Sequence, residues 1–204
     1  RALGYTMVMP TEDKYSVTRN ELLDQLAYAM GGRVAEELVF HDPTTGASND
    51  IEKATATARK MVKEYGMSER VGALRLGQAD GEVFLGRDMG HEREYSEEVA
   101  GLVDEEVRRL IDSAHDEAWE ILTEYREVLD ELARRLLEEE TLDAQELEEV
   151  YNPVVKRDPR PVWLSSQKRT VSDVPPVSVL SKTKMELPAG ENNVTEAPAE
   201  AGDE

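Results

Sequence analysis

Apolar residues recur at helical spacing through most of the first 150 residues, and this repeat limits the chain to a mainly α fold. The longest repeat follows Ser96, a suitable helix cap, and continues to about Thr123. A second repeat covers roughly Glu124–Glu139, and a short one ends near Val150. The apolar positions of the longest repeat are Val99, Leu102, Val103, Val107, Leu110, Ile111, Ala114, Ala118, Trp119 and Leu122.

Two capping boxes mark where helices begin. The sequences Thr18-Arg19-Asn20-Glu21 and Asp143-Ala144-Gln145-Glu146 each place a carboxylate three residues after a capping side chain. The first box predicts a helix that ends at His41-Asp42-Pro43. Gly31-Gly32 lies inside that helix, which indicates either close approach by another backbone or a kink.

Other segments depart from the helical pattern. Residues Ala2 to Pro10 predict a short β-strand near the N-terminus, and the Gly-rich stretch Met67–Gly90 predicts a hairpin or an ordered loop. From Asn152 the periodicity stops, and seven of the nine prolines lie between Pro153 and Pro198. We therefore expect a folded domain over residues 1–151 and a disordered, Pro-rich tail over residues 152–204.

Charge and composition exclude several classes of function. The formal net charge of −20 argues against a nucleic-acid-binding surface. Residues 91–149 hold 22 acidic and 6 basic side chains, which we interpret as solvated helix faces in preference to an acidic binding surface. The absence of cysteine excludes a thiolate zinc site. No apolar run approaches the roughly 20 residues that span a bilayer, so we expect this chain to be soluble.

The turn Thr44-Thr45-Gly46-Ala47-Ser48-Asn49-Asp50-Ile51 is the strongest candidate for a functional element. Ser48 or Asn49 is a suitable N-cap for a helix that starts near Ile51 and ends at Gly66. Asp50 would then lie in the first turn of that helix. By pattern alone, a carboxylate there is an ordinary partner of the helix dipole.

The three histidines do not form a metal site by themselves. A zinc-hydrolase helix needs His-Glu-x-x-His, and the nearest match, His91-Glu92-Arg93-Glu94-Tyr95, has tyrosine at its fifth position. His41 ends a helix, and His115 lies in the acidic helix as a surface or helical-pair residue. The chain also lacks a Walker-type phosphate loop and a Gly-x-Ser-x-Gly elbow.

Several motifs nevertheless resemble, in order, the peptidase domain of the FtsH-type ATP-dependent zinc metalloproteases. The resemblance covers about residues 1–150. The motifs are Arg1-Ala2-Leu3-Gly4-Tyr5-Thr6, Gly31-Gly32-Arg33-Val34-Ala35-Glu36-Glu37-Leu38, Thr45-Gly46-Ala47-Ser48-Asn49-Asp50-Ile51, Ala58-Arg59-Lys60-Met61-Val62, Tyr65-Gly66-Met67-Ser68 and Val83-Phe84-Leu85-Gly86-Arg87.

The resemblance implies a helical metallopeptidase domain in a homo-hexamer beneath an AAA ATPase ring that uses ATP and Mg. Transmembrane helices would precede it, at the cytoplasmic face of a bacterial inner membrane, and its substrates would be unfolded membrane and soluble proteins. In this family, zinc is held by two histidines of His-Glu-x-x-His and by an aspartate that corresponds to Asp50. The glutamate of that motif is the general base, and zinc polarises the scissile carbonyl.

This chain departs from the family pattern because it begins at Arg1, after the position of the His-Glu-x-x-His helix. Two zinc ligands and the general base therefore lie outside it, and no catalytic residue is expected within it. We expect the 204 residues alone to be inactive. A non-enzymatic helical assembly module of a ring complex is the alternative interpretation.

The predicted N-terminal strand has a second possible role. Zinc proteases often align an extended substrate along an edge strand beside the metal. Gly4, Tyr5 and Thr6 are the candidate substrate-binding residues, and an ordinary sheet strand is the alternative.

Overall fold

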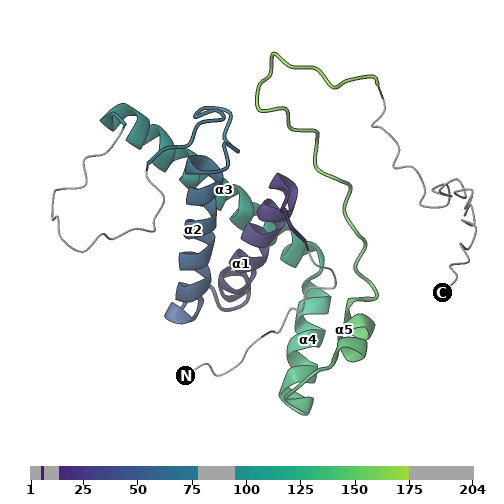
Figure 1. Ribbon diagram of the computed structural model, residues 1–204. Helices are drawn as coiled ribbons and strands as arrows, with labels where there is room; N and C mark the ends of the chain where they lie inside the picture. Colours follow the sequence, from purple (N-terminus) through teal and green to yellow (C-terminus); the bar gives the residue numbers. More distant parts are fainter. Residues whose placement is uncertain (1–5, 7–13, 78–94, 175–204) are drawn as a thin grey trace, which may run out of the picture. The chain divides into compact units, whose positions relative to one another are not determined.

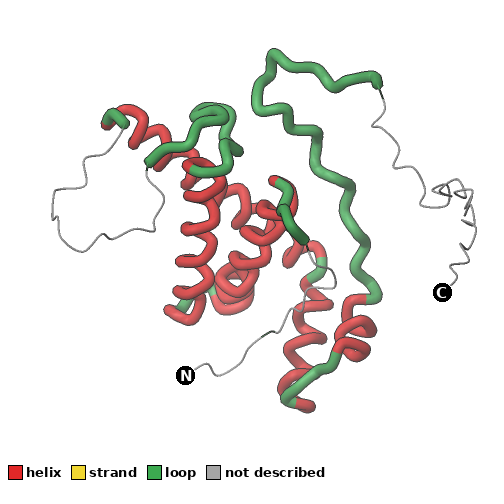
Figure 2. Tube along the Cα trace, viewed as in Figure 1, coloured by secondary structure: helices red, strands yellow, loops and turns green. Residues whose placement is uncertain are grey.

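The computed structural model describes residue 6 and residues 14–77 and 95–174. The chain divides into two units, residues 1–170 and residues 171–204, and the helices belong to the first. The described residues form five α-helices and one short 3₁₀ turn, with no strand among them (Figures 1 and 2). The mainly α fold is therefore confirmed, whereas the strand predicted at Ala2 to Pro10 lies outside the described residues, apart from Thr6.

Three helices form the core of the first unit. Helix α1 (Arg19–Phe40) packs against both α2 (Ser48–Lys63) and α3 (Glu97–Glu124), and α2 packs against α3 (Figure 1). Alanines four residues apart line α2 and α3 at this junction, which allows close approach of the helices. The buried core residues are Leu22, Leu26, Met30, Val34, Ala54, Ala58, Met61, Val62, Val71, Val103, Val107, Leu110, Ala114 and Ala118.

The helix ends follow the local sequence signals. The Thr18 hydroxyl accepts from the Glu21 N–H while the Glu21 side chain accepts from the Thr18 N–H, so the predicted capping box is confirmed. His41 ends α1 in the left-handed region, with φ of 58°. Gly66 follows α2 with φ of 61°, and a Cβ built there would lie 2.8 Å from Ala73 Cα. Glycine is therefore needed at that position.

Helices α4 (Arg126–Glu139) and α5 (Ala144–Tyr151) form a second, smaller pair. The predicted Asp143 capping box opens α5. Arg135 joins the two helices: it pairs with Glu139 on α4 at 3.0 Å and with Glu149 on α5 at 3.6 Å. No helix in the described ranges is long and apolar enough to cross a membrane.

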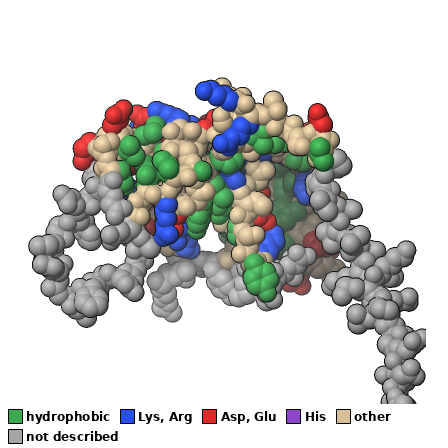
Figure 3. All heavy atoms as spheres, turned by 45° about the horizontal axis from the view of Figure 1, so that its top comes forward, with side chains coloured by type: hydrophobic (Ala, Val, Ile, Leu, Met, Phe, Trp, Pro, Cys, Tyr) green, Lys and Arg blue, Asp and Glu red, His purple; other side chains and the backbone are tan. Residues whose placement is uncertain are grey.

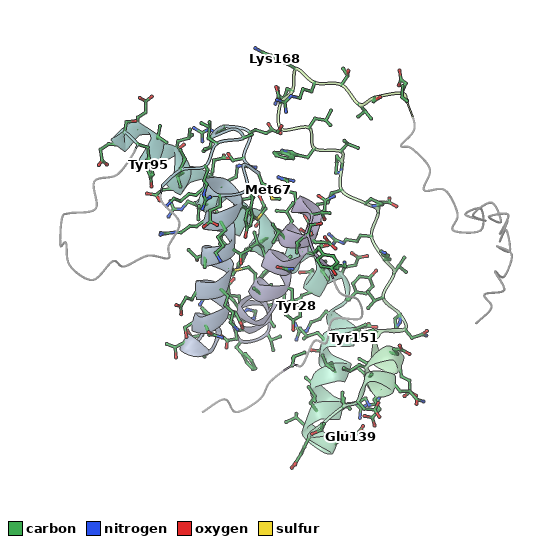
Figure 4. All side chains as sticks on the ribbon, in the orientation of Figure 1. Tyr28, Met67, Tyr95, Glu139, Tyr151 and Lys168 are labelled. Carbon is green, nitrogen blue, oxygen red and sulfur yellow. The ribbon has the colours of Figure 1, made fainter. Side chains whose placement is uncertain are left out.

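The residues between α2 and α3 are described only as far as residue 77. Met67 lies in the loop that follows α2 (Figure 4), and the described part of this loop contains neither helix nor strand. The Leu76 N–H donates to the Lys63 carbonyl at 2.8 Å, which folds the loop back to the end of α2. The hairpin considered for the rest of Met67–Gly90 lies outside the described residues.

Residues 152–170 are the first part of the segment for which the sequence predicts a disordered tail. They form an extended segment in the first unit (Figure 2), and Arg157 and Arg160 make ion pairs with acidic residues of α1 and α3. These contacts are polar and not periodic, so a pattern of apolar residues does not predict them. The rest of the predicted tail, from residue 175, lies outside the described residues.

Candidate functional site

Asp50 lies in the first turn of α2 and is half-buried. The unpaired N–H groups at a helix start favour a carboxylate there. No hydrogen bond or ion pair joins the Asp50 side chain to another described residue, although many acidic side chains in this chain are paired. Among the described residues, its carboxylate oxygens therefore have no partner that would prevent them from binding another group.

The turn before Asp50 is a single 3₁₀ turn, Thr45–Ala47, that continues directly into α2. The Thr44 hydroxyl accepts from the Gly46 N–H at 3.1 Å. Ser48 or Asn49 was predicted as the N-cap of α2, and this prediction was wrong. Ala47 occupies the cap position, and its methyl group cannot form a side-chain capping bond. The Ser48 N–H donates to the Thr45 carbonyl within the 3₁₀ turn.

Glu36 of α1 fixes this turn in place. Its carboxylate accepts from the Thr44 N–H at 2.7 Å and from the Thr44 hydroxyl at 2.8 Å. These two hydrogen bonds hold the pKa of Glu36 below its usual value. A Cβ on Gly46 would lie 3.2 Å from Thr44 Oγ1 and 3.3 Å from Glu36 Oε1, so a larger residue there would make these two side chains shift by a few tenths of an ångström. The start of α2, and with it Asp50, is thus anchored to α1.

The neighbouring Glu37 joins α1 to α3. Its carboxylate lies 2.6 Å from Arg33 Nε and 2.9 Å from His115 Nε2. Burial alone raises the pKa of Glu37, but the hydrogen bonds from Arg33 and His115 outweigh it and hold this pKa below its usual value. His115 therefore has its partner on a different helix, which differs from the surface or same-helix role expected from its position.

Glu106 is the buried acidic group that connects α3 to the loop after α2. It accepts from the Ser68 hydroxyl at 2.6 Å and from Arg109 Nε at 3.0 Å. Ser68 is itself buried and accepts from the Val71 N–H at 3.1 Å. Burial raises the pKa of Glu106, and the bonds from Arg109 and Ser68 lower it by more, so the side chain stays ionised. This link fixes the loop at the opposite end of α2 from Asp50.

The described part of the chain contains no group of three or more side chains that could hold a metal ion. His41 ends α1 with Nδ1 at 3.1 Å from the Glu37 carbonyl, and His91 lies outside the described residues. Gly4 and Tyr5 also lie outside them, while Thr6 is exposed and in no regular element. The residues present fit one carboxylate ligand of a metal site, Asp50.

Sequence reasoning missed the residues that support Asp50. Glu36, Glu37 and Ser68 occur in motifs that carried the family resemblance, but spacing alone assigns them no partner. Thr44 and Glu36 are eight residues apart and on different elements, and Ser68 and Glu106 are 38 residues apart. Only the Glu106 position gave a usable signal, since it is a charged residue within the apolar stripe of α3.

Comparison with known proteins gives a family match over most of the chain. The family model described as Peptidase family M41 matches residues 1–150. An ATP-dependent zinc metalloprotease FtsH from Cutibacterium acnes is 56% identical over 177 residues, covering 87% of this chain and 25% of the relative. The proteins of the same name from Mycobacterium leprae and Rhodococcus erythropolis are 53% and 51% identical, over 91% and 98% of this chain. The chain spans about a quarter of the length of these relatives.

Proposed function

The chain belongs to peptidase family M41, and we propose that it contributes Asp50 as one ligand of the catalytic zinc of an ATP-dependent endopeptidase. The observation that carries this proposal is the free, half-buried Asp50 carboxylate on a helix start that Glu36 and Thr44 hold in place. A carboxylate oxygen is a suitable zinc ligand beside two imidazoles.

The residues of this chain position the ligand. Hydrogen bonding of Glu36 to the turn sets the start of α2, and the hydrogen bond between His115 and Glu37 holds α1 against α3. Zinc, when bound, would act as a Lewis acid on the scissile carbonyl. Since the three histidines of this chain do not form His-Glu-x-x-His, the other ligands and the general base must come from further residues of the complete protein.

The complete protein would be a membrane-anchored homo-hexamer that degrades unfolded membrane and soluble proteins. The names of the relatives support the ATP-dependent zinc metalloprotease activity of this assignment. The membrane anchor, the homo-hexamer and the substrates rest on the family resemblance of the sequence. The AAA ATPase domain, with its ATP and Mg, would belong to the same parent chain. We place the complete protein at the cytoplasmic face of a bacterial inner membrane because of the resemblance of its sequence to the FtsH-type family.

The experiment that tests the function is Asp50→Ala in the complete protein. We expect casein cleavage to be lost and ATP hydrolysis to be largely kept, because Asp50 makes no bond that supports the fold. Glu52→Ala is the matched control, since Glu52 is exposed in the same helical turn. Cleavage by Asp50→Ala at the rate of the control would refute the proposal.

We further propose that Gly4, Tyr5 and Thr6 align the substrate as an edge strand. Backbone hydrogen bonds to an extended peptide require a free N–H at the pairing positions, which proline lacks. Thr6→Pro in the complete protein should therefore raise KM for a peptide substrate. An unchanged KM would remove this assignment while leaving the metal ligand untouched.

A further inference from the structure

Three side chains of the extended segment that follows α5 contact the helices, at every third residue. We call these side chains, Arg157, Arg160 and Trp163, the anchors. We call residues 155–163 the strap. Arg157 lies 3.2 Å from carboxylate oxygens of both Glu120 and Glu124, two residues of α3. The strap lies beyond residue 150, where the match to the peptidase family ends.

The second anchor, Arg160, joins α3 to α1. Its Nη2 donates to both carboxylate oxygens of Glu117 at 2.6 and 2.7 Å. Its Nη1 lies 2.5 Å from Asp24 Oδ1 and 3.3 Å from the Asn20 carbonyl of α1. The side chain of Arg160 is only 24% exposed, so this contact is better shielded from solvent than the pairs of Arg157, whose side chain is 39% exposed.

Trp163 is the third anchor. The guanidinium of Arg19, at the start of α1, lies 4.6 Å from the centre of the Trp163 ring, within range of a cation–π contact. Arg19 Nε is buried and has no hydrogen-bond partner among the described residues. The aromatic ring therefore supplies the Arg19 cation with a contact in addition to its electrostatic interactions with Glu69 and Glu106.

The three anchors recur at every third residue. A polyproline II segment has three residues per turn, so this spacing would place positions 157, 160 and 163 on one side of such a segment. Pro159 and Pro161 fix their own φ near −65° and restrict the residues before them to extended conformations. A segment of this kind loses little conformational entropy on docking, which favours binding.

The acidic face of α3 is complementary to this segment. Glu117, Glu120 and Glu124 are spaced by three and four residues, so they lie on one side of the helix, where like charges repel. Two arginines of the strap partly neutralise the negative charge of these three glutamates and of Asp24. Three acidic side chains on this side of α3 therefore contact arginines of the strap.

We propose that the face formed by α1 and α3 is a docking surface for an extended, Pro-containing peptide of the pattern Arg-x-x-Arg-Pro-x-Trp, and that the chain's own strap is its occupant. In the strap, two cations and one aromatic ring at three-residue spacing make the contacts with this surface. Tyr125 sets the start of the docked segment, because its hydroxyl accepts from the Val155 N–H at 3.2 Å.

The test uses the full 204-residue chain with the strap released by Arg157→Ala and Arg160→Ala. A dye-labelled peptide of residues 153–168 is titrated into it, and fluorescence anisotropy reports binding. We expect the released chain to bind this peptide about tenfold more tightly than the wild-type chain does, because the strap of the wild-type chain already occupies the face formed by α1 and α3. A peptide with Ala at position 160 should bind about tenfold more weakly.

Two further variants test whether the peptide binds to the face formed by α1 and α3. Glu117→Gln in the released chain should weaken peptide binding, and Glu105→Gln, at an exposed acid elsewhere on α3, should not. Equal affinity of the released and wild-type chains, or an equal effect of the two glutamate variants, would overturn the proposal.

A second measurement leaves the strap itself unchanged. Trypsin cleavage after Arg157 should be faster in a Glu120→Gln, Glu124→Gln chain than in the wild-type chain, since docking protects Arg157. Equal cleavage rates would show that the strap is not docked in solution.

Discussion

Glu106 illustrates how single polar residues hold this helical unit together. Its side chain is 1% exposed, and removing it would leave the buried Ser68 hydroxyl and half of the Arg109 fork without an acceptor. We expect Glu106→Ala to lower the free energy of unfolding by about 2–3 kcal/mol, measured by urea denaturation. The neighbouring Glu105, 65% exposed in its pair with Arg70, is the control and should cost less than about 1 kcal/mol.

The contribution of Glu106 to the free energy of unfolding should also depend on pH. Because the pKa of folded Glu106 lies below its unfolded value, ionised Glu106 stabilises the fold above the unfolded pKa, near about 4.3. This stability is lost as pH falls through the folded pKa. Glu106→Gln should therefore show a shallower loss of stability below about pH 5 than the wild-type chain. Parallel curves for the two chains would contradict the assigned role.

At the scale of elements, the surroundings of Gly31 and Gly32 in α1 bear on whether another backbone lies close to this glycine pair or the pair marks a kink. Nothing in the described structure lies within 4 Å of a Cβ built at either position. Close approach of another backbone is therefore not observed among the residues that the structure describes. We expect Gly32→Ala to raise the unfolding free energy of the isolated chain by about 0.5–1 kcal/mol, because alanine restricts the unfolded chain.

Gly66→Ala is the matched comparison for that prediction. It forces a side chain into the left-handed region and against Ala73, so it should lower stability where Gly32→Ala raises it. Urea denaturation of the two variants under the same conditions makes the comparison. A destabilising Gly32→Ala would indicate a close contact at α1 that this chain forms in solution.

The sequence predicted the helices well because their causes are local. Capping boxes at Thr18 and Asp143 and the apolar repeat after Ser96 involve neighbours three or four residues apart. The 3₁₀ turn before Asp50 escaped prediction because Glu36, on another helix, stabilises it. The contacts of the strap are likewise not local, since its hydrogen-bond partners lie 30 to 140 residues away.

At the scale of the whole molecule, the described surface is mixed. On the face shown in Figure 3, hydrophobic side chains reach the surface between charged ones. Tyr28 and Phe40 of α1 are 65% and 71% exposed, and Figure 4 shows Tyr28 on that helix. The chain spans about a quarter of the length of the relatives that it matches.

The proposed division of the zinc ligands predicts that these 204 residues alone lack activity. One carboxylate does not hold a catalytic zinc, which needs three protein ligands. The purified chain should show no casein cleavage above that of an Asp50→Ala chain, with or without added zinc. Cleavage that EDTA abolishes would mean that this chain contains a complete site of its own.

The most direct test of the account is the zinc content of the complete protein after dialysis against a weak chelator. If Asp50 is a ligand, the wild-type protein and the exposed-residue variant Glu52→Ala should retain zinc, and Asp50→Ala should lose it, because only two histidine ligands remain. Circular dichroism of the three proteins should be the same, since Asp50 has no hydrogen-bond or ion-pair partner in the described structure. Equal zinc retention by Asp50→Ala and Glu52→Ala would contradict the assignment of Asp50 as a zinc ligand.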